Sequence, residues 1–114
     1  MKIYIATPVN GRNEKTLLEK RQAAFERVKK IAEYLKGRYP DAECHSSFDE
    51  HIAPLRGALV WREATIMGAC VQEVMDCDAI ILDEGWESSK GCQVEHHVAR
   101  VYGKKVGFYT DWEK

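Results

Sequence analysis

Residues 78–103 read DAIILDEGWESSKGCQVEHHVARVYG, and two contrasting patterns stand side by side at the start of this stretch. The segment Asp78–Asp83 is a nearly continuous apolar run bounded by two aspartates, which is typical of a central parallel strand covered on both faces. The loop that follows, residues 84–91, is polar and contains two serines. We therefore expect a buried strand that opens into a polar loop.

A helix is predicted directly after this loop, over about residues 92–102. Valines recur there at helical spacing, and Gly103 is a natural helix terminator. The expected core-facing stripe of this helix consists of Val94, Val98 and Val101.

The rest of the sequence continues an alternation of strands and helices. Short β-rich runs predict strands at Lys2–Ala6, Ala42–His45 and Lys105–Tyr109. Helical spacing predicts one helix over about 13–36, ending at Gly37, and another over about 59–75. The expected inward positions are Leu17, Leu18, Ala24, Phe25, Val28, Ile31, Ala32 and Leu35 in the first helix, and Val60, Ile66, Met67, Val71 and Val74 in the second.

This alternation predicts a parallel sheet with right-handed crossovers. We expect a single α/β domain over residues 1–114, a flavodoxin-like three-layer sandwich with four or five parallel strands in the order 2-1-3-4. Residues 46–57 have no clear period and are expected to form a loop that makes one wall of a binding cleft.

Composition narrows the classes of partner. With a net charge of −1 and a pI of about 6.4, the protein lacks the excess positive charge that binding to a nucleic acid polymer requires. The apolar runs are far shorter than the roughly 20 residues of a membrane helix, and Met1–Ala6 is too short for a signal peptide. We expect a cytoplasmic protein with four reduced cysteines. The cysteine spacing includes no C-x-x-C pair, so no structural metal is expected. No cofactor is expected either.

A ligand site is predicted where the strand order reverses, between the first strand and the strand at 78–83. Two loops meet there, Thr7–Asn13 and Asp83–Gly91, and each leads into a helix N-terminus that favours anions. Ser88 and Ser89 add hydroxyl groups to the second loop, although either of them can equally serve as a helix cap.

Glu95 stands about one turn into the predicted third helix, beside its apolar stripe. Spacing alone makes such a glutamate a solvated or ion-paired residue more often than a functional one. His96 and His97 follow it directly, and the spacing assigns a role to neither.

Two blocks of sequence resemble the nucleoside 2-deoxyribosyltransferase superfamily. The first is the strand and turn Lys2–Pro8, and the second runs from Cys77–Ile80 through Gly85–Glu95 to Gly103–Val106. The second block is the more specific, because it combines strand, loop, helix and glutamate in one register. The chain is most similar to a small, functionally uncharacterised branch of this superfamily.

The resemblance implies an N-glycosidase or deoxyribosyltransferase that acts on a 2′-deoxynucleoside or its 5′-monophosphate. In the superfamily, the glutamate matching Glu95 attacks the anomeric carbon, and the serine matching Ser89 contacts the 5′-phosphate. The expected substrate-binding residues are Tyr4, Thr7, Pro8, Asn10, Gly85, Trp86, Ser88, Ser89 and Gly91. Trp86 is the leading candidate for stacking on the base, ahead of Trp61, although it can equally pack the loop down.

The chain departs from the superfamily at the acid that serves the leaving base. Cys70 stands where relatives carry an aspartate, and a thiol is a poor substitute for a carboxyl group. Asp83 is expected to take over this role as the second catalytic residue, with Glu63 as the alternative. The first turn also carries Thr7 where glycine is common, so backbone approach to a ligand is expected to differ.

Three functional hypotheses remain open at this stage. The first is the glycosidase or transferase, the second a non-catalytic nucleotide-binding module that lost its acid at Cys70, and the third a homo-oligomeric interaction protein. The resemblance also implies a homodimer or larger assembly, in which the tail Asp111–Lys114 completes a neighbour's pocket.

Overall fold

The computed structural model describes residues 1–9, 16–49, 52 and 63–109. Within these residues the chain forms a parallel four-stranded sheet in the order β2-β1-β3-β4, as predicted. The strands are β1 (Lys2–Ala6), β2 (Glu43–His45), β3 (Ala79–Leu82) and β4 (Lys105–Phe108). The helices are α1 (Leu17–Arg38), α2 (Glu63–Asp76) and α3 (Lys90–Val101), with a short 3₁₀ helix, η2 (Trp86–Ser88), before α3.

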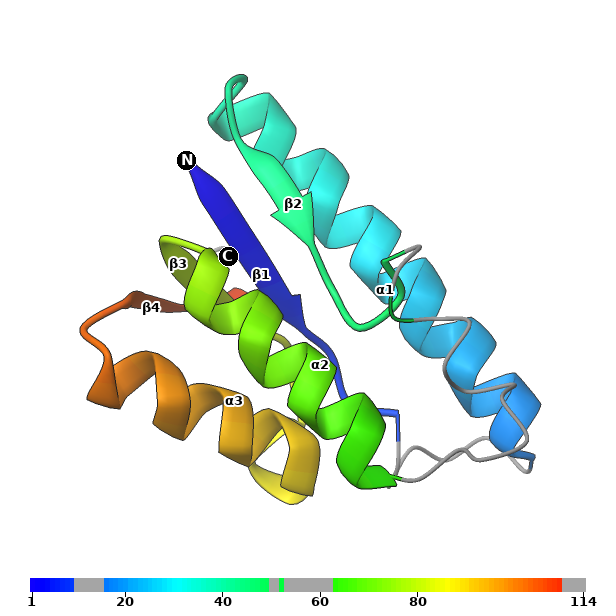
Figure 1. The fold of residues 1–114 in the computed structure, drawn as a ribbon. Helices are drawn as coiled ribbons and strands as arrows, with labels where there is room; N and C mark the ends of the chain where they lie inside the picture. Colours follow the sequence, from blue (N-terminus) through cyan, green and yellow to red (C-terminus); the bar gives the residue numbers. More distant parts are fainter. Residues whose placement is uncertain (10–15, 50–51, 53–62, 110–114) are drawn as a thin grey trace.

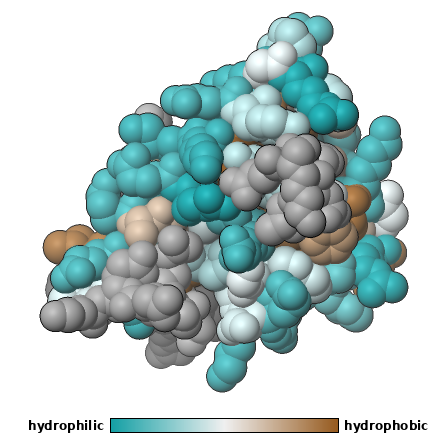
Figure 2. Space-filling view, turned by 180° about the vertical axis from the view of Figure 1, so that it is seen from behind, coloured by the Kyte–Doolittle hydropathy of each residue, from teal (hydrophilic) through white to brown (hydrophobic). Residues whose placement is uncertain are grey.

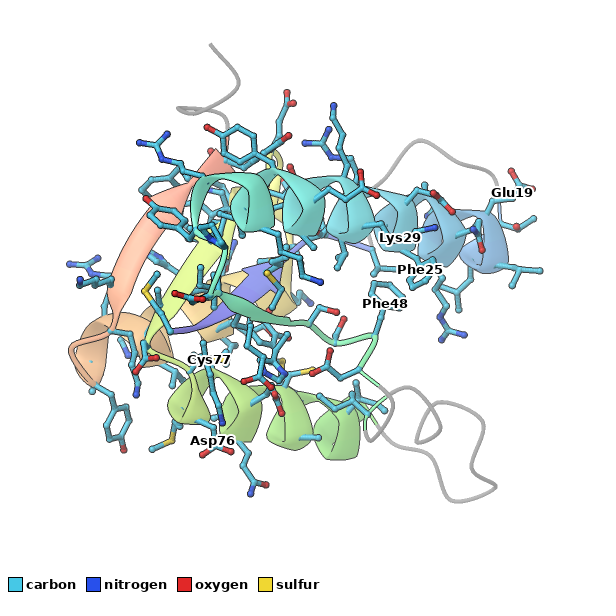
Figure 3. All side chains as sticks on the ribbon, turned by 90° about the horizontal axis from the view of Figure 1, so that it is seen from above. Glu19, Phe25, Lys29, Phe48, Asp76 and Cys77 are labelled. Carbon is cyan, nitrogen blue, oxygen red and sulfur yellow. The ribbon has the colours of Figure 1, made fainter. Side chains whose placement is uncertain are left out.

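The sheet is the middle of three layers. Figure 1 shows α2 and α3 side by side, and Figure 3 places α1 and α2 on opposite sides of the strands. Alternate residues of β1 therefore enter two separate cores, with Ile3 and Ile5 packed toward α1, and Tyr4 and Ala6 toward α2 and α3. All four residues of β3 are buried, which confirms the central strand expected from the apolar run.

The first helix is capped at both ends by its own sequence. The Thr16 hydroxyl accepts a hydrogen bond from the Glu19 amide at 3.1 Å, which satisfies one of the unpaired donors of the first turn. The helix passes through Gly37 and ends at Arg38, contrary to the prediction that Gly37 ends it. Tyr39 precedes Pro40, and the proline ring disfavours a helical conformation at that position.

The predicted apolar stripe of α1 is correct only toward the C-terminal end of the helix. Ala24, Ile31 and Leu35 are buried, and Val28 and Ala32 are half-buried, whereas Leu17, Leu18 and Phe25 are exposed. The N-terminal part of α1 extends beyond the carboxyl end of the sheet, so its apolar side chains have no strand to cover (Figure 1). The Phe25 ring instead contacts the edge of Phe48, with ring centroids 5.7 Å apart (Figure 3).

The core-facing side of α3 differs from the prediction. Val94 and Val101 are exposed and Val98 is half-buried, while the buried positions are Cys92, Glu95 and Ala99. Small side chains at two of the inward positions allow α3 to pack closely against α2 and the sheet. Glu95 consequently lies on the buried face of the helix itself.

The second helix follows its prediction. Ile66 and Val74 are buried, and Met67 and Val71 are half-buried, while Val60 falls outside the described residues. All four cysteines are free, as expected.

The surface opposite the view of Figure 1 is mainly hydrophilic, with small separate apolar areas (Figure 2). No helix in the described part of the chain combines the length and the apolar character required to cross a bilayer. On the α1 side, the amino ends of β1, β3 and β4 border an apolar hollow of about 200 Å³ lined by Ile3, Tyr39, Ile81 and Val106, among other residues. This hollow lies at the opposite end of the sheet from the loops described next.

Candidate functional site

The described residues of the two loops expected to form a ligand site lie close together at the carboxyl ends of β1 and β3. The Asp83 amide donates to the Ala6 carbonyl at 2.9 Å, which extends the pairing of the two strands into the loops. Gly85 adopts a φ of +86°, a left-handed conformation that favours glycine. A Cβ atom at Gly85 would lie 3.7 Å from Cγ of Pro8, so the turn after β1 is in contact range of the turn after β3.

Glu95 is buried next to this junction, with only 5% of its surface exposed. Its carboxylate accepts a hydrogen bond from the hydroxyl of Tyr4, which lies on β1 and is 1% exposed. Burial, followed by the negative charge of Glu95, raises the pKa of Tyr4 well above its usual value. The Tyr4 hydroxyl therefore keeps its proton at neutral pH and remains a donor to Glu95.

Two buried thiols complete the surroundings of Glu95. Cys70, on α2, is hydrogen-bonded to Tyr4, so it lies in the cluster of side chains around Glu95. Cys92 lies one turn before Glu95 on α3, and burial together with the Glu95 charge raises its pKa to about 12. The Cys92 thiol is therefore neutral and a poor nucleophile under ordinary conditions.

Ser89 is the N-cap of α3. Its hydroxyl accepts a hydrogen bond from the Cys92 amide at 3.3 Å, and the residue is 8% exposed. Ser88 is exposed at the end of η2, and Gly91 is half-buried in the first turn of α3. The positive end of the α3 dipole thus opens onto the loop, with one hydroxyl committed to the helix and the other accessible to solvent.

Thr7 follows β1 at the same edge of the sheet. The residue is 9% exposed, and its hydroxyl is buried without a hydrogen-bond partner among the described residues. A buried hydroxyl without a partner is unusual, because its desolvation is not compensated. Thr7 therefore offers an unused donor and acceptor at the carboxyl end of β1.

Asp83 is held by an arginine that was not singled out from the sequence. Nε of Arg27 donates to one carboxylate oxygen at 3.0 Å and Nη2 donates to the other at 2.5 Å. The Glu84 amide adds a third hydrogen bond at 2.7 Å. Asp83 is only 1% exposed, and both of its oxygens are engaged in these hydrogen bonds, so the carboxylate is turned toward the protein and has little access to a substrate.

Trp86 packs onto the protein. Its ring centroid lies 4.6 Å from that of His96 on α3 and 5.8 Å from that of Phe108 on β4. Of the two roles expected for this tryptophan, these contacts favour packing the loop against the helix and sheet. Burial, with a smaller contribution from Arg100, lowers the pKa of His96, so the imidazole beside Trp86 is neutral at pH 7.

Several residues named from the sequence fall outside the described residues. These are Asn10, Trp61 and the tail Asp111–Lys114. Glu63 is the first residue of α2, and its side chain lies outside the described part of the structure.

Two of the contacts that organise this site leave no signal in the local sequence. Arg27 reads as a solvated residue of a charged helix, and nothing local pairs it with Asp83. Tyr4 was expected at the site, but as a substrate contact and not as the partner of Glu95. The alternation of side chains along β1 places Tyr4 on the face that α2 and α3 cover, and this alternation is the sequence feature that could have indicated contact between Tyr4 and α3.

The structure is similar to that of a 2-desoxiribosyltransferase from Leishmania mexicana, with a TM-score of 0.59 and 22% sequence identity over 94% of this chain and 62% of that chain. The chain therefore spans less than two thirds of that protein, and the likeness shows that the two share a fold. No curated protein matches the sequence. The family model described as a domain of unknown function (DUF4406) matches residues 1–108, and this chain belongs to that family.

Proposed function

We propose that this protein cleaves the bond between base and sugar in a 2′-deoxynucleoside or its 5′-monophosphate, with Glu95 as the nucleophile. The observation that carries the proposal is the buried Glu95 carboxylate, hydrogen-bonded by Tyr4, at the junction of the loops that follow β1 and β3. Burial of an acidic group costs free energy, so a buried carboxylate is expected to have a functional role. Nucleophilic attack on a sugar is the role that agrees best with this fold.

The proposed reaction has two displacements. An oxygen of Glu95 forms a bond to C1′ while the bond from C1′ to the base nitrogen breaks, and the base leaves with that electron pair and takes up a proton from water. Water then attacks C1′, releases Glu95 and gives the free sugar, or a second base takes the sugar instead. Tyr4 orients the attacking carboxylate throughout, because its raised pKa keeps the hydroxyl protonated.

The N-terminus of α3 is the proposed site for the 5′-phosphate. Unpaired amides and the helix dipole favour an anion there, and the exposed hydroxyl of Ser88 can add a hydrogen bond. Thr7, whose buried hydroxyl lacks a partner among the described residues, is the proposed contact on the β1 side. Together these groups favour a monophosphate over a free nucleoside.

The structural contacts of Asp83 favour a role other than proton donor. Arg27 and the Glu84 amide occupy both of its oxygens, so we assign Asp83 to hold the loop after β3 against α1. The base then leaves without a carboxylic acid to protonate it. Bases that leave readily on their own are the substrates this arrangement favours.

Base release from a panel of 2′-deoxynucleosides and their 5′-monophosphates, followed by chromatography, tests the proposal. The wild type is compared with Glu95→Gln, which keeps the size of the side chain, and with His97→Ala, an exposed change on the same helix. We expect release by the wild type and His97→Ala and none by Glu95→Gln. Unchanged release by a folded Glu95→Gln variant would refute the role of Glu95.

A second candidate function is a nucleotide-binding module without turnover. The specific observation in its favour is that Cys70 is a buried thiol hydrogen-bonded to Tyr4, while Asp83 is paired with Arg27, so no free acid faces Glu95 from either position. In this reading a nucleotide raises the melting temperature but no base is released.

Cys70→Asp distinguishes the two functions, with Cys70→Ser as the control that changes size little and adds no acid. Under the glycosidase proposal, Cys70→Asp increases base release, because a carboxyl group can protonate the leaving base. Under the binding-module reading, neither variant releases base and both still bind the nucleotide.

A further inference from the structure

A second cluster of polar side chains lies at the β2 edge of the sheet, apart from the Glu95 site. It consists of His45 at the end of β2, Asp49 in the segment after β2, and Glu73 on α2. Nδ1 of His45 lies 2.8 Å from Oδ2 of Asp49 and 2.8 Å from Oε1 of Glu73. The three ligand atoms all lie within 4.8 Å of one another, on side chains that are largely withdrawn from solvent.

Hydrogen bonds among these three side chains cannot satisfy all of their polar atoms. One imidazole nitrogen carries at most one proton, yet two carboxylate oxygens stand at equal distance from Nδ1. The two carboxylates also repel each other, and Glu73 is only 8% exposed, which limits screening by water. A positive charge among the three groups would remove both difficulties.

The other side of the imidazole adds a second observation. Nε2 of His45 is buried and makes no hydrogen bond among the described residues, although an oxygen of Glu43 lies 3.3 Å away. A histidine that binds a metal through one nitrogen usually directs its other N–H at a carboxylate. Glu43 is placed to receive that proton after a small adjustment.

We propose that His45, Asp49 and Glu73 form a binding site for one divalent transition-metal ion. One imidazole nitrogen with two carboxylate oxygens suits Zn²⁺ or Mn²⁺ better than Mg²⁺ or Ca²⁺, which prefer oxygen ligands alone. Metal–ligand distances of about 2.0–2.2 Å place neighbouring donor atoms about 3 Å apart, close to the 2.8 Å between Nδ1 of His45 and each carboxylate oxygen. Three protein ligands leave coordination positions open for water or for an oxygen of a ligand.

The site is independent of the proposed glycosidase. His45 is the register partner of Tyr4, so the cluster lies one strand away from the Glu95 site, under α2. An ion there would join β2 and the segment that follows it to α2. Its binding is measured without any assay of base release, so either proposal can fail while the other holds.

The test is isothermal titration of the metal-stripped protein with ZnCl₂ and MnCl₂, and with MgCl₂ for comparison. We expect one Zn²⁺ ion or one Mn²⁺ ion per chain and no heat from Mg²⁺. His45→Ala and Glu73→Gln should each abolish binding, and Glu43→Gln should weaken it by about tenfold to 100-fold. Circular dichroism checks the fold of each variant, and if His45→Ala does not fold, Glu73→Gln decides the outcome because it preserves shape.

Two matched controls exclude other ligands. His97→Ala removes an exposed histidine on α3, and Cys44→Ser removes the thiol next to His45, which is the least buried of the cysteines. Both variants should bind the metal as the wild type does. A wild type that binds neither Zn²⁺ nor Mn²⁺, binding that survives in a folded Glu73→Gln variant, or binding that disappears in Cys44→Ser would each overturn the proposal.

Discussion

The hydroxyl of Tyr4, on the first strand, donates a hydrogen bond to the carboxylate of Glu95, on the last helix, and both residues are buried. This contact joins β1, one of the two inner strands of the sheet, to the helix whose N-terminus faces the loops. It fixes the direction of a carboxylate that has little access to water. The chemistry proposed for the protein depends on this pair more than on any other.

Removal of the Tyr4 hydroxyl should impair both stability and turnover. In Tyr4→Phe the Glu95 carboxylate loses a buried donor, which should lower the free energy of unfolding by about 1–3 kcal/mol. Because Glu95 is then less well oriented, kcat should fall on the order of 100-fold. Urea denaturation and base-release kinetics measure the two effects. Tyr34→Phe, at a half-buried tyrosine on α1, is the control and should leave kcat unchanged.

The Ser89 cap provides a test of the phosphate site. Ser89→Ala should reduce the free energy of unfolding by about 1 kcal/mol, because the Cys92 amide loses its acceptor. Because loss of the cap loosens the first turn of α3, whose amides form the proposed phosphate site, it should also weaken binding of a 5′-monophosphate more than binding of the nucleoside. Thr16→Ala removes the equivalent cap of α1 at a similar cost in stability, and it should leave this preference intact. If both variants lose the preference for the monophosphate over the nucleoside equally, the loss follows from reduced stability, and the proposed phosphate site at the N-terminus of α3 is contradicted.

The pair formed by Arg27 and Asp83 should behave as a structural unit. In a double-mutant cycle with Arg27→Gln and Asp83→Asn, we expect a coupling energy of about 1–3 kcal/mol, read from urea midpoints. Base release by each variant should remain close to wild type under conditions where it is folded. A kcat that collapses in folded Asp83→Asn, but not in Arg27→Gln, would restore Asp83 as a catalytic residue.

Stability should decline in alkaline solution, beginning near pH 9. Burial, followed by nearby carboxylates, raises the pKa of Cys77 and Cys92 from 9.0 to about 12, so above pH 9 these thiols ionise in the unfolded chain and not in the folded one. The unfolded state then binds fewer protons, and stability falls by about 1.4 kcal/mol per pH unit for each thiol. Tyr4 adds to the slope above pH 10.

Urea midpoints between pH 7 and pH 11 measure this slope. Cys92→Ala should reduce it, whereas Cys44→Ser, at a less buried thiol, should change it less. An equal slope in wild type and Cys92→Ala would show that the buried thiol does not contribute.

The sequence predicted the sheet well for a physical reason. A parallel strand that is covered on both faces must be apolar throughout, so the run Asp78–Asp83 identified an inner strand of the sheet. The turn residues around the other β-rich runs indicated where the remaining strands end. Apolar periodicity misplaced the buried face of α3, because its inward residues are two small side chains and a carboxylate. A buried glutamate does not register as an inward position in a hydropathy pattern. The burial of Glu95 is also the feature that points to a function for this helix face.

The contacts of the site depend on tertiary structure and left little trace in the local sequence. Arg27 on α1 meets Asp83 after β3 only because the sheet brings α1 across that loop. His45 and Glu73 meet because β2 lies at the sheet edge that α2 covers. Neither pairing follows a motif, and sequence spacing therefore gave no indication of them.

The most direct test of the account is base release from 2′-deoxynucleoside 5′-monophosphates by the wild type and by Glu95→Gln, measured side by side. The account predicts release by the wild type that is lost in Glu95→Gln while its melting temperature shows a folded protein. Equal release by both proteins would contradict it, because the bond would then break without the carboxylate that Tyr4 holds in place.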